Sequence, residues 1–268
     1  MSGPRWLFEF EDLNWFPHTI RESMTDFLCH LLRITHFYAP VLPLIREGMQ
    51  RSKTTQLVDL CSGGGGPAAE ILSGLAKPNT NVHMTLTDKF PNTSAWKMLQ
   101  RKHPHIGFIE TSMDAAHLPS DLKGFRTVFS AVHHLDEKTI TAILANAAES
   151  RSGIGIFDGG DKNLLPILGI ILVHPLLFFF LTPFFRPFRF SRIFFTYLVP
   201  IIPLCTIWDG IISILRLYRP DELLAIAQNA GIDNYEWHAG QRKNKFGMQV
   251  TYLMGYPQTT NDATQGLS

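Results

Sequence analysis

The sequence has little net charge and few charged residues. Lys and Arg number 24 against 23 Asp and Glu, so the net charge is +1, and charged residues make up 18% of the 268 residues. Binding to nucleic acid through general basicity needs a surplus of Lys and Arg, and we therefore expect no nucleic-acid partner. The charged share is also below the roughly 25% that is usual for soluble domains. This shortage predicts that apolar surface is hidden in an unusual place or lies against lipid.

Cysteine is scarce, and the N-terminus has no long apolar stretch. Cys29, Cys61 and Cys205 lie far apart and form no CxxC pair, which excludes a disulfide framework or a zinc knuckle. We predict no metal site and a reducing compartment. The first residues run into Glu9, Glu11 and Asp12, so no signal peptide is expected and the predicted localisation is cytoplasmic.

What the chain does contain is an alternation of short apolar runs and helical stretches. Strands are predicted at 56–60, 82–87, 106–110, 125–130 and 153–157, with helices at 67–76, 95–102 and 137–150 between them. A later helix through 229 and two strands, 235–239 and 249–256, follow a long interruption. Strands separated by helices build a parallel sheet that is covered on both faces, so the pattern predicts an α/β fold.

A glycine-rich turn follows the first predicted strand. Asp59 lies near the end of that strand, and four consecutive glycines at 63–66 lead into the next helix. Glycines let the backbone approach a ligand closely, and a helix N-terminus offers unpaired N–H groups. A dinucleotide-binding loop would have the spacing GxGxxG, which these glycines match poorly. Nicotinamide or flavin binding is therefore the alternative for this loop.

The acid on strand one, the glycine turn and the acids after strands two and three resemble the class I S-adenosylmethionine-dependent methyltransferase family. The resemblance covers residues 55–160 and 219–256, and Cys61 stands where the family usually has its first glycine. It implies S-adenosylmethionine as cofactor and a Rossmann-like, seven-stranded, mostly parallel sheet with helices on both faces. Asp88 would bind the ribose hydroxyls and Asp114 would lie near the adenine. The cofactor-binding residues it implies are Asp59, Cys61, Ser62, Gly63, Gly65, Asp88, Lys89, Asp114, Ala115 and Ser130.

Candidate catalytic residues follow the fourth and fifth strands. His133, His134 and Asp158 could remove a proton from the methyl acceptor, because imidazole titrates near neutrality. The alternative is that a histidine here only packs near the cofactor. Four further side chains are candidates for substrate binding, with packing or turn capping as the alternative: Trp15, Arg21, Asp161 and Asp209.

The least ordinary segment is an apolar insertion after the fifth strand. Between residues 164 and 215 the only charges are Arg186, Arg189, Arg192 and Asp209, and 164–185 carries none. A bilayer span needs about 20 apolar residues, so this run is long enough. Several prolines interrupt it, and the strands before and after it must lie on one side. We therefore expect two broken helices dipping into one leaflet, with the three arginines at the headgroups. A homodimer interface, an active-site wall and a true transmembrane anchor are the alternatives.

The predicted organisation has four parts. A helical cover occupies 1–50, the cofactor-binding domain 51–162 and 217–257, the apolar insertion 163–216, and a disordered tail 258–268. The predicted function is methyl transfer from S-adenosylmethionine to a hydrophobic or lipid-like small molecule by a cytoplasmic protein that binds a membrane surface through 164–207. One alternative keeps the fold and cofactor but performs another transfer or a cyclisation. The other is a membrane-associated adaptor without catalysis.

Overall fold

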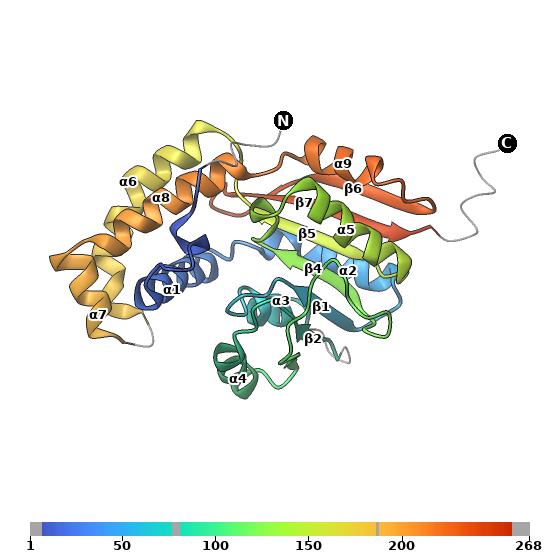
Figure 1. Cartoon of the computed structure of the whole chain (residues 1–268), viewed down its shortest axis with the longest axis horizontal. Helices are drawn as coiled ribbons and strands as arrows, with labels where there is room; N and C mark the ends of the chain where they lie inside the picture. Colours follow the sequence, from blue (N-terminus) through green and yellow to red (C-terminus); the bar gives the residue numbers. More distant parts are fainter. Residues whose placement is uncertain (1–6, 77–80, 186–187, 259–268) are drawn as a thin grey trace.

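The alternating apolar runs form one sheet of seven strands (Figure 1). The computed structural model describes residues 7–76, 81–185 and 188–258. The strands are β1 (Gln56–Leu60), β2 (His83–Leu86), β3 (Ile106–Phe108), β4 (Phe125–Phe129), β5 (Ile154–Gly159), β6 (Tyr235–Lys243) and β7 (Gln249–Pro257). Their order is β3-β2-β1-β4-β5-β7-β6. The first five pair in parallel, and β7 is antiparallel to both β5 and β6. This sheet confirms the predicted fold class.

Helices cover both faces of the sheet because its central strands, β1, β4 and β5, are buried on both sides. On one face pack α2 (Leu42–Arg51), α3 (Ala68–Leu75) and α4 (Thr93–Lys102). On the other face pack α5 (Glu137–Glu149) and α9 (Pro220–Asn229). Side-chain caps begin two of these helices, since Asn92 accepts the Ala95 N–H and Asp136 accepts the Thr139 N–H. The parallel strands therefore end together at one edge, where open α/β sheets bind ligands.

A lobe of four helices lies beside the sheet (Figure 1). This helical lobe consists of α1 (His18–Ile34), α6 (Leu164–Leu181), α7 (Phe190–Ile193) and α8 (Ile201–Arg216). Its core contains Phe27 stacked on Phe178, with ring centroids 3.8 Å apart. Helix α1 belongs to this lobe, whereas α2 packs on the sheet. The stretch 1–50 is therefore divided between two parts of the molecule.

The apolar insertion differs in two ways from the expectation. Helix α6 runs unbroken through Pro175, so only the second arm is interrupted: α7 continues into a π-helical turn at Phe194–Leu198 before α8 begins. The placement of the arginines at lipid headgroups was wrong for Arg192, which is buried and pairs with Asp26 on α1. Arg189 pairs with Glu22 and stays partly exposed, so its placement remains a prediction. Arg186 lies outside the described residues, as does the predicted disordered tail beyond residue 258.

The C-terminal hairpin is longer than the sequence predicted. Strand β6 continues to Lys243, whereas the predicted strand ended at residue 239. Its partner β7 supplies the backbone hydrogen bonds that make this possible, with Lys243 opposite Gln249. The tip is fixed because Asn244 Nδ2 donates to the Thr35 carbonyl at 3.2 Å, just beyond α1.

Candidate functional site

The floor of the glycine loop is a buried carboxylate. Asp59, at the end of β1, is 3% exposed. It accepts hydrogen bonds from Ser62 Oγ at 2.7 Å and from Thr127 Oγ1 at 2.8 Å. Burial raises the pKa of Asp59 to about 7, although both hydrogen bonds act to lower it. The hydrogen bond between Asp59 and Ser62 thus stabilises the turn, and the one from Thr127 connects Asp59 to β4.

The loop itself has an open outer side. Cys61 has a φ of 55°, in the left-handed region that favours glycine, so the residue at the family's glycine position keeps the glycine conformation. A Cβ added at Gly63, Gly64 or Gly66 would meet nothing within 4 Å. At Gly65 it would lie 2.8 Å from a side chain of α4. The loop therefore packs on α4 through Gly65 and leaves its other glycines accessible to a ligand.

Asp88 connects the end of β2 to the glycine loop. Its Oδ2 accepts the Gly63 N–H at 2.8 Å, and its Oδ1 accepts the Phe90 N–H at 2.8 Å. A carboxylate has about four lone-pair sites, so each oxygen can accept one more hydrogen bond. Trp96 strengthens the same corner, because its Nε1 donates to the Gly63 carbonyl at 2.9 Å. The geometry suits a pair of neighbouring hydroxyls beside the loop.

The segments after β2 and β3 also meet. Ser112 Oγ donates to the Lys89 carbonyl at 2.7 Å, and Lys89 Nζ lies 3.8 Å from Asp114 Oδ2. Asp114 Oδ1 accepts the Ala116 N–H at 2.9 Å, and this bond lowers the pKa of its carboxyl group. Ala115 is buried in the core. Lys89 and Asp114 therefore form a polar rim beside Asp88.

The end of β4 contributes Ser130, which has a φ of 48°. Its hydroxyl shares a hydrogen bond with the hydroxyl of Tyr38, a fully buried residue between α1 and α2. Tyr38 also meets the ring of Phe129 at a centroid distance of 5.0 Å. Ser130 is therefore held in place by the layer that covers the sheet.

His133 is oriented by Asp158. The Nδ1 atom of His133 lies 2.8 and 2.9 Å from the two oxygens of Asp158, and the His133 backbone N–H donates to the same carboxylate at 2.9 Å. Asp158 is buried at 2% exposure. Burial acts to raise its pKa, but the charge and hydrogen bonds of His133 outweigh burial and lower it. Since Nδ1 faces Asp158, Nε2 is the His133 nitrogen available to other groups.

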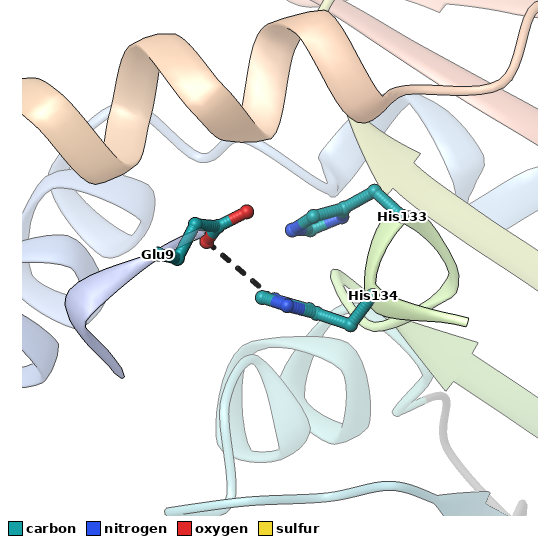
Figure 2. A group of neighbouring side chains, drawn as sticks. All are labelled: Glu9, His133 and His134. Carbon is teal, nitrogen blue, oxygen red and sulfur yellow. Dashed lines mark ion pairs between the residues drawn. The ribbon is translucent and has the colours of Figure 1, made fainter. Parts of the chain in front are cut away.

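His134 lies beside His133 and faces the N-terminal segment (Figure 2). The two imidazole centroids are 4.2 Å apart. His134 Nε2 is 3.9 Å from Glu9 Oε2, and His134 Nδ1 is 3.3 Å from Asp12 Oδ1. Burial acts to lower the pKa of His134, but Asp12 and Glu9 overcome it and raise the pKa to about 9. Glu9, Asp12, His133, His134 and Asp158 are called the histidine–carboxylate cluster below.

The structure places the other predicted substrate-binding residues in supporting contacts. Asp209, buried on α8, accepts the backbone N–H groups of Phe10 at 2.7 Å and Glu11 at 3.1 Å. Arg21 Nη2 donates to the Leu13 carbonyl at 2.6 Å. Both side chains therefore fix the N-terminal segment over the strand ends, and their role in substrate binding stays a prediction.

Asp161 and Trp15 also have local roles. Asp161 Oδ2 accepts a hydrogen bond from Gln249 Nε2 at 2.7 Å, which links the turn after β5 to β7. Trp15 is 72% exposed and touches Phe16 edge-on. Asp161 therefore caps a turn, and Trp15 is the predicted residue of this group whose ring stays accessible.

Sequence reasoning missed three residues of the site. Glu9 and Asp12 reach His134, and Arg216 on α8 donates to Glu9 Oε1 at 3.1 Å and Asp12 Oδ2 at 3.0 Å. The acidic start of the chain was a visible signal. Its position over β4 depends on contacts between residues about 200 positions apart, which sequence spacing does not encode.

The outer face of the helical lobe is apolar. One helix in the described part of the chain, Leu164–Phe184, is long and apolar enough to cross a membrane, and 11% of it is buried. Two bent helix pairs, His18–Ile34 with Ala39–Arg51 and Phe190–Leu198 with Ile201–Arg216, meet the same criterion as pairs. The exposed large apolar side chains of the lobe include Leu164, Leu165, Leu168, Ile171, Leu172, Val173, Leu176, Phe179, Phe180, Phe184, Phe190, Leu198 and Leu204.

Comparison with known proteins supports the fold. No protein-family model matches the chain, and no curated protein sequence is similar to it. Human N-acetylserotonin methyltransferase in complex with S-adenosylmethionine superposes with a TM-score of 0.51 at 12% identity, over 95% of this chain and 64% of that one. An O-methyltransferase from neocarzinostatin biosynthesis, in complex with S-adenosylhomocysteine and 1,4-dihydroxy-2-naphthoic acid, gives 0.50 at 13% identity, over 90% and 59%. The chain thus has the fold of these methyltransferases and spans about six tenths of their length.

Proposed function

We propose that the chain is an S-adenosylmethionine-dependent methyltransferase that acts on a hydrophobic or lipid-like acceptor at a membrane surface. The observation that carries the proposal is the junction between Asp88 and Gly63. It joins an open glycine loop to a carboxylate that can accept further hydrogen bonds, at the edge where parallel strands end. This junction supports a ribose-containing cofactor, and the methyltransferase fold together with the poor match to GxGxxG favours S-adenosylmethionine over a dinucleotide.

The residues present fit the cofactor. The open side of Gly63 and Gly64 leaves room for a ligand against the backbone. In this proposal Asp88 accepts the ribose hydroxyls, Asp114 and Lys89 border the adenine, and Ser130 lies on the methionine side. When bound, S-adenosylmethionine supplies an activated methyl group, so the protein's main task is to hold the acceptor in line with it.

The acceptor side is the histidine–carboxylate cluster. For a hydroxyl acceptor the proton has to leave as the methyl group arrives, and groups within reach of that oxygen assist its loss. His133 is held by Asp158 in one orientation, with its Nε2 atom available. His134 completes the pair beside it. We therefore assign ionisation of the acceptor to the place where these two histidines meet.

The helical lobe supports a membrane surface as the source of the acceptor. Its outer face presents large apolar side chains from α6, among them Leu172 at 65% and Phe180 at 65% exposure. Apolar surface of this extent marks an interaction site. The proposed state is a cytoplasmic protein bound peripherally through 164–207. A second copy of the chain on the same face is the competing occupant.

The cofactor assignment is tested by calorimetric titration with S-adenosylhomocysteine. We expect saturable binding that Asp88→Ala weakens by about tenfold to a hundredfold, because a hydrogen bond to a charged group contributes about 1.5–3 kcal/mol. Asp233→Ala, an exposed carboxylate before β6, is the control and should bind as the wild type does. Absence of binding, or equal binding by Asp88→Ala, refutes the assignment. Formation of S-adenosylhomocysteine during turnover separates methyl transfer from another use of the cofactor.

A further inference from the structure

The histidine–carboxylate cluster carries an excess of negative charge. Glu9, Asp12 and Asp158 contribute three carboxylates, and Arg216 is the guanidinium in contact with two of them. A metal ion binds neutral imidazole and displaces its proton, so three carboxylates and one guanidinium would leave a net charge of −2 around the ion. Glu9 and Asp158 are each 2% exposed, so solvent does little to screen this charge. One divalent cation would balance it.

Three ligand atoms converge at this point. One side-chain atom each from Glu9, His133 and His134 lies within 4.8 Å of the others (Figure 2). Metal–nitrogen and metal–oxygen bonds to Zn²⁺ are about 2.0–2.2 Å, so small side-chain movements would bring all three atoms into coordination distance. Arg216 contacts the Oε1 atom of Glu9, whereas Oε2 accepts a hydrogen bond from Ser213 Oγ at 3.1 Å and lies 3.9 Å from His134 Nε2. A carboxylate oxygen has two lone-pair sites, so Oε2 can keep the Ser213 contact and still bind an ion.

Both histidines are also held as metal ligands usually are. A ligating imidazole commonly donates its other ring N–H to a carboxylate, which fixes the ring and raises its basicity. Here Nδ1 of His133 faces Asp158 at 2.8 Å, and Nδ1 of His134 faces Asp12 at 3.3 Å. In each case Nε2 is the nitrogen left for a metal. Two oriented imidazoles and one carboxylate form a set of three ligands with coordination positions to spare.

We propose that Glu9, His133 and His134 bind one divalent transition-metal ion, with Asp158 and Asp12 as the carboxylates that orient the two histidines. The ligand set of two nitrogens and one oxygen favours Zn²⁺ and related ions over Mg²⁺, which prefers oxygen ligands. Only the catalytic role of the ion rests on the proposed function. Binding of the ion does not, because it is measured without turnover.

In the proposed function the ion would bind the acceptor. A hydroxyl oxygen on a divalent metal loses its proton more readily, here to water. The ionised oxygen then forms a bond to the methyl carbon, while the bond between that carbon and the sulfonium sulfur breaks and its electron pair stays on sulfur. His133 and His134 act as ligands in this step, and the ion supplies the charge that stabilises the oxyanion.

The test is calorimetric titration of the full chain, carrying no polyhistidine tag, with Zn²⁺ and separately with Mg²⁺. We expect one saturable Zn²⁺ per chain and no comparable Mg²⁺ binding. His134→Gln and Glu9→Gln should each weaken Zn²⁺ binding by more than tenfold. Asp158→Asn should weaken it by roughly tenfold to a hundredfold, as loss of an orienting carboxylate does elsewhere. The control is His36→Gln, which alters a histidine paired with Glu70 at 3.0 Å outside the cluster, and its affinity should be unchanged.

Two outcomes overturn the proposal. One is the absence of stoichiometric Zn²⁺ binding by the wild-type chain. The other is equal Zn²⁺ affinity in His134→Gln and the wild type, with thermal melts showing that both are folded. Titration with S-adenosylhomocysteine runs in parallel on the same preparations. A chain that binds Zn²⁺ but not S-adenosylhomocysteine refutes the proposed function alone, and the reverse result refutes the metal site alone.

Discussion

The guanidinium of Arg192 on α7 is buried against the carboxylate of Asp26 on α1. Arg192 is 2% exposed and Asp26 is 28% exposed. Burial lowers the pKa of Arg192 and raises the pKa of Asp26, so loss of solvent opposes both charges. Such a pair contributes little net stability, but it makes the loss of either partner costly. It therefore fixes how the apolar insertion sits on α1.

Asp26→Asn should destabilise the chain much more than Glu22→Gln. Removal of one charge from a buried pair costs about 3 kcal/mol, whereas a partly exposed pair such as Glu22 with Arg189 contributes less than about 1 kcal/mol. Urea denaturation of the two variants measures the difference. Equal losses would contradict the structure, and the apolar replacement Asp26→Leu with Arg192→Met should recover most of the loss.

Cys61→Gly should be more stable than Cys61→Ala by about 1 kcal/mol. Both variants remove the thiol, but at a φ of 55° only the alanine keeps a Cβ that opposes the left-handed conformation. Thermal unfolding of the two variants gives the comparison directly. A more stable alanine variant would mean that the turn after Asp59 has another conformation in solution.

Asp59 should make the chain less stable as the pH rises through 7. Its pKa is about 7 in the folded chain and about 3.9 when unfolded, so the folded state binds the proton more tightly. The stabilisation is present in full below pH 4 and is lost above pH 7. Between pH 5 and pH 8 the loss is about 2.5 kcal/mol.

The comparison for Asp59 is with Asp59→Asn, which cannot ionise there. Urea denaturation of both chains at several pH values isolates the contribution of this carboxyl group from all others. The difference in unfolding free energy between the wild-type chain and Asp59→Asn should change by about 2.5 kcal/mol from pH 5 to pH 8. A difference that stays constant from pH 5 to pH 8 would show that Asp59 is already ionised at the lower pH.

The sheet and the glycine loop could be predicted because their signals are local. An apolar run ending in glycines determines the geometry of the turn after β1, and the acid after β2 has to lie beside it once the two strands pair in parallel. Cys61 shows the limit of such reasoning. The sequence shows that it replaces a glycine, and only the backbone shows that the left-handed conformation is kept.

The contacts made by the N-terminal segment and the insertion could not be predicted. Glu9 meets His134 and Arg216, and Asp209 binds the backbone of Phe10, across separations that no periodicity records. The arginines of the insertion could equally have faced phosphate groups. Arg192 instead pairs with Asp26 on α1, because a buried guanidinium needs a carboxylate partner.

The outer face of α6 should bind lipid vesicles. Leu168, Leu172 and Leu176 are 44%, 65% and 58% exposed and follow one another at four-residue steps, on one side of the helix. Moving such a side chain from water into hydrocarbon contributes roughly 1.5–3 kcal/mol. The wild-type chain should therefore float with vesicles of phosphatidylcholine and phosphatidylglycerol, and the triple change of these leucines to Gln should leave the chain in the soluble fraction.

The control for the vesicle experiment replaces equally exposed apolar residues elsewhere. Met98 on α4 is 57% exposed and Phe246 at the β6–β7 turn is 60% exposed, so Met98→Gln with Phe246→Gln removes comparable apolar surface outside the lobe. This variant should still float.

Gel filtration without vesicles tests the competing occupant of this face, a second copy of the chain. A second copy on α6 would give a dimer that the triple variant dissociates. A wild-type chain that is dimeric and does not float would assign this face to self-association, since one surface cannot be covered by a partner and by lipid at once.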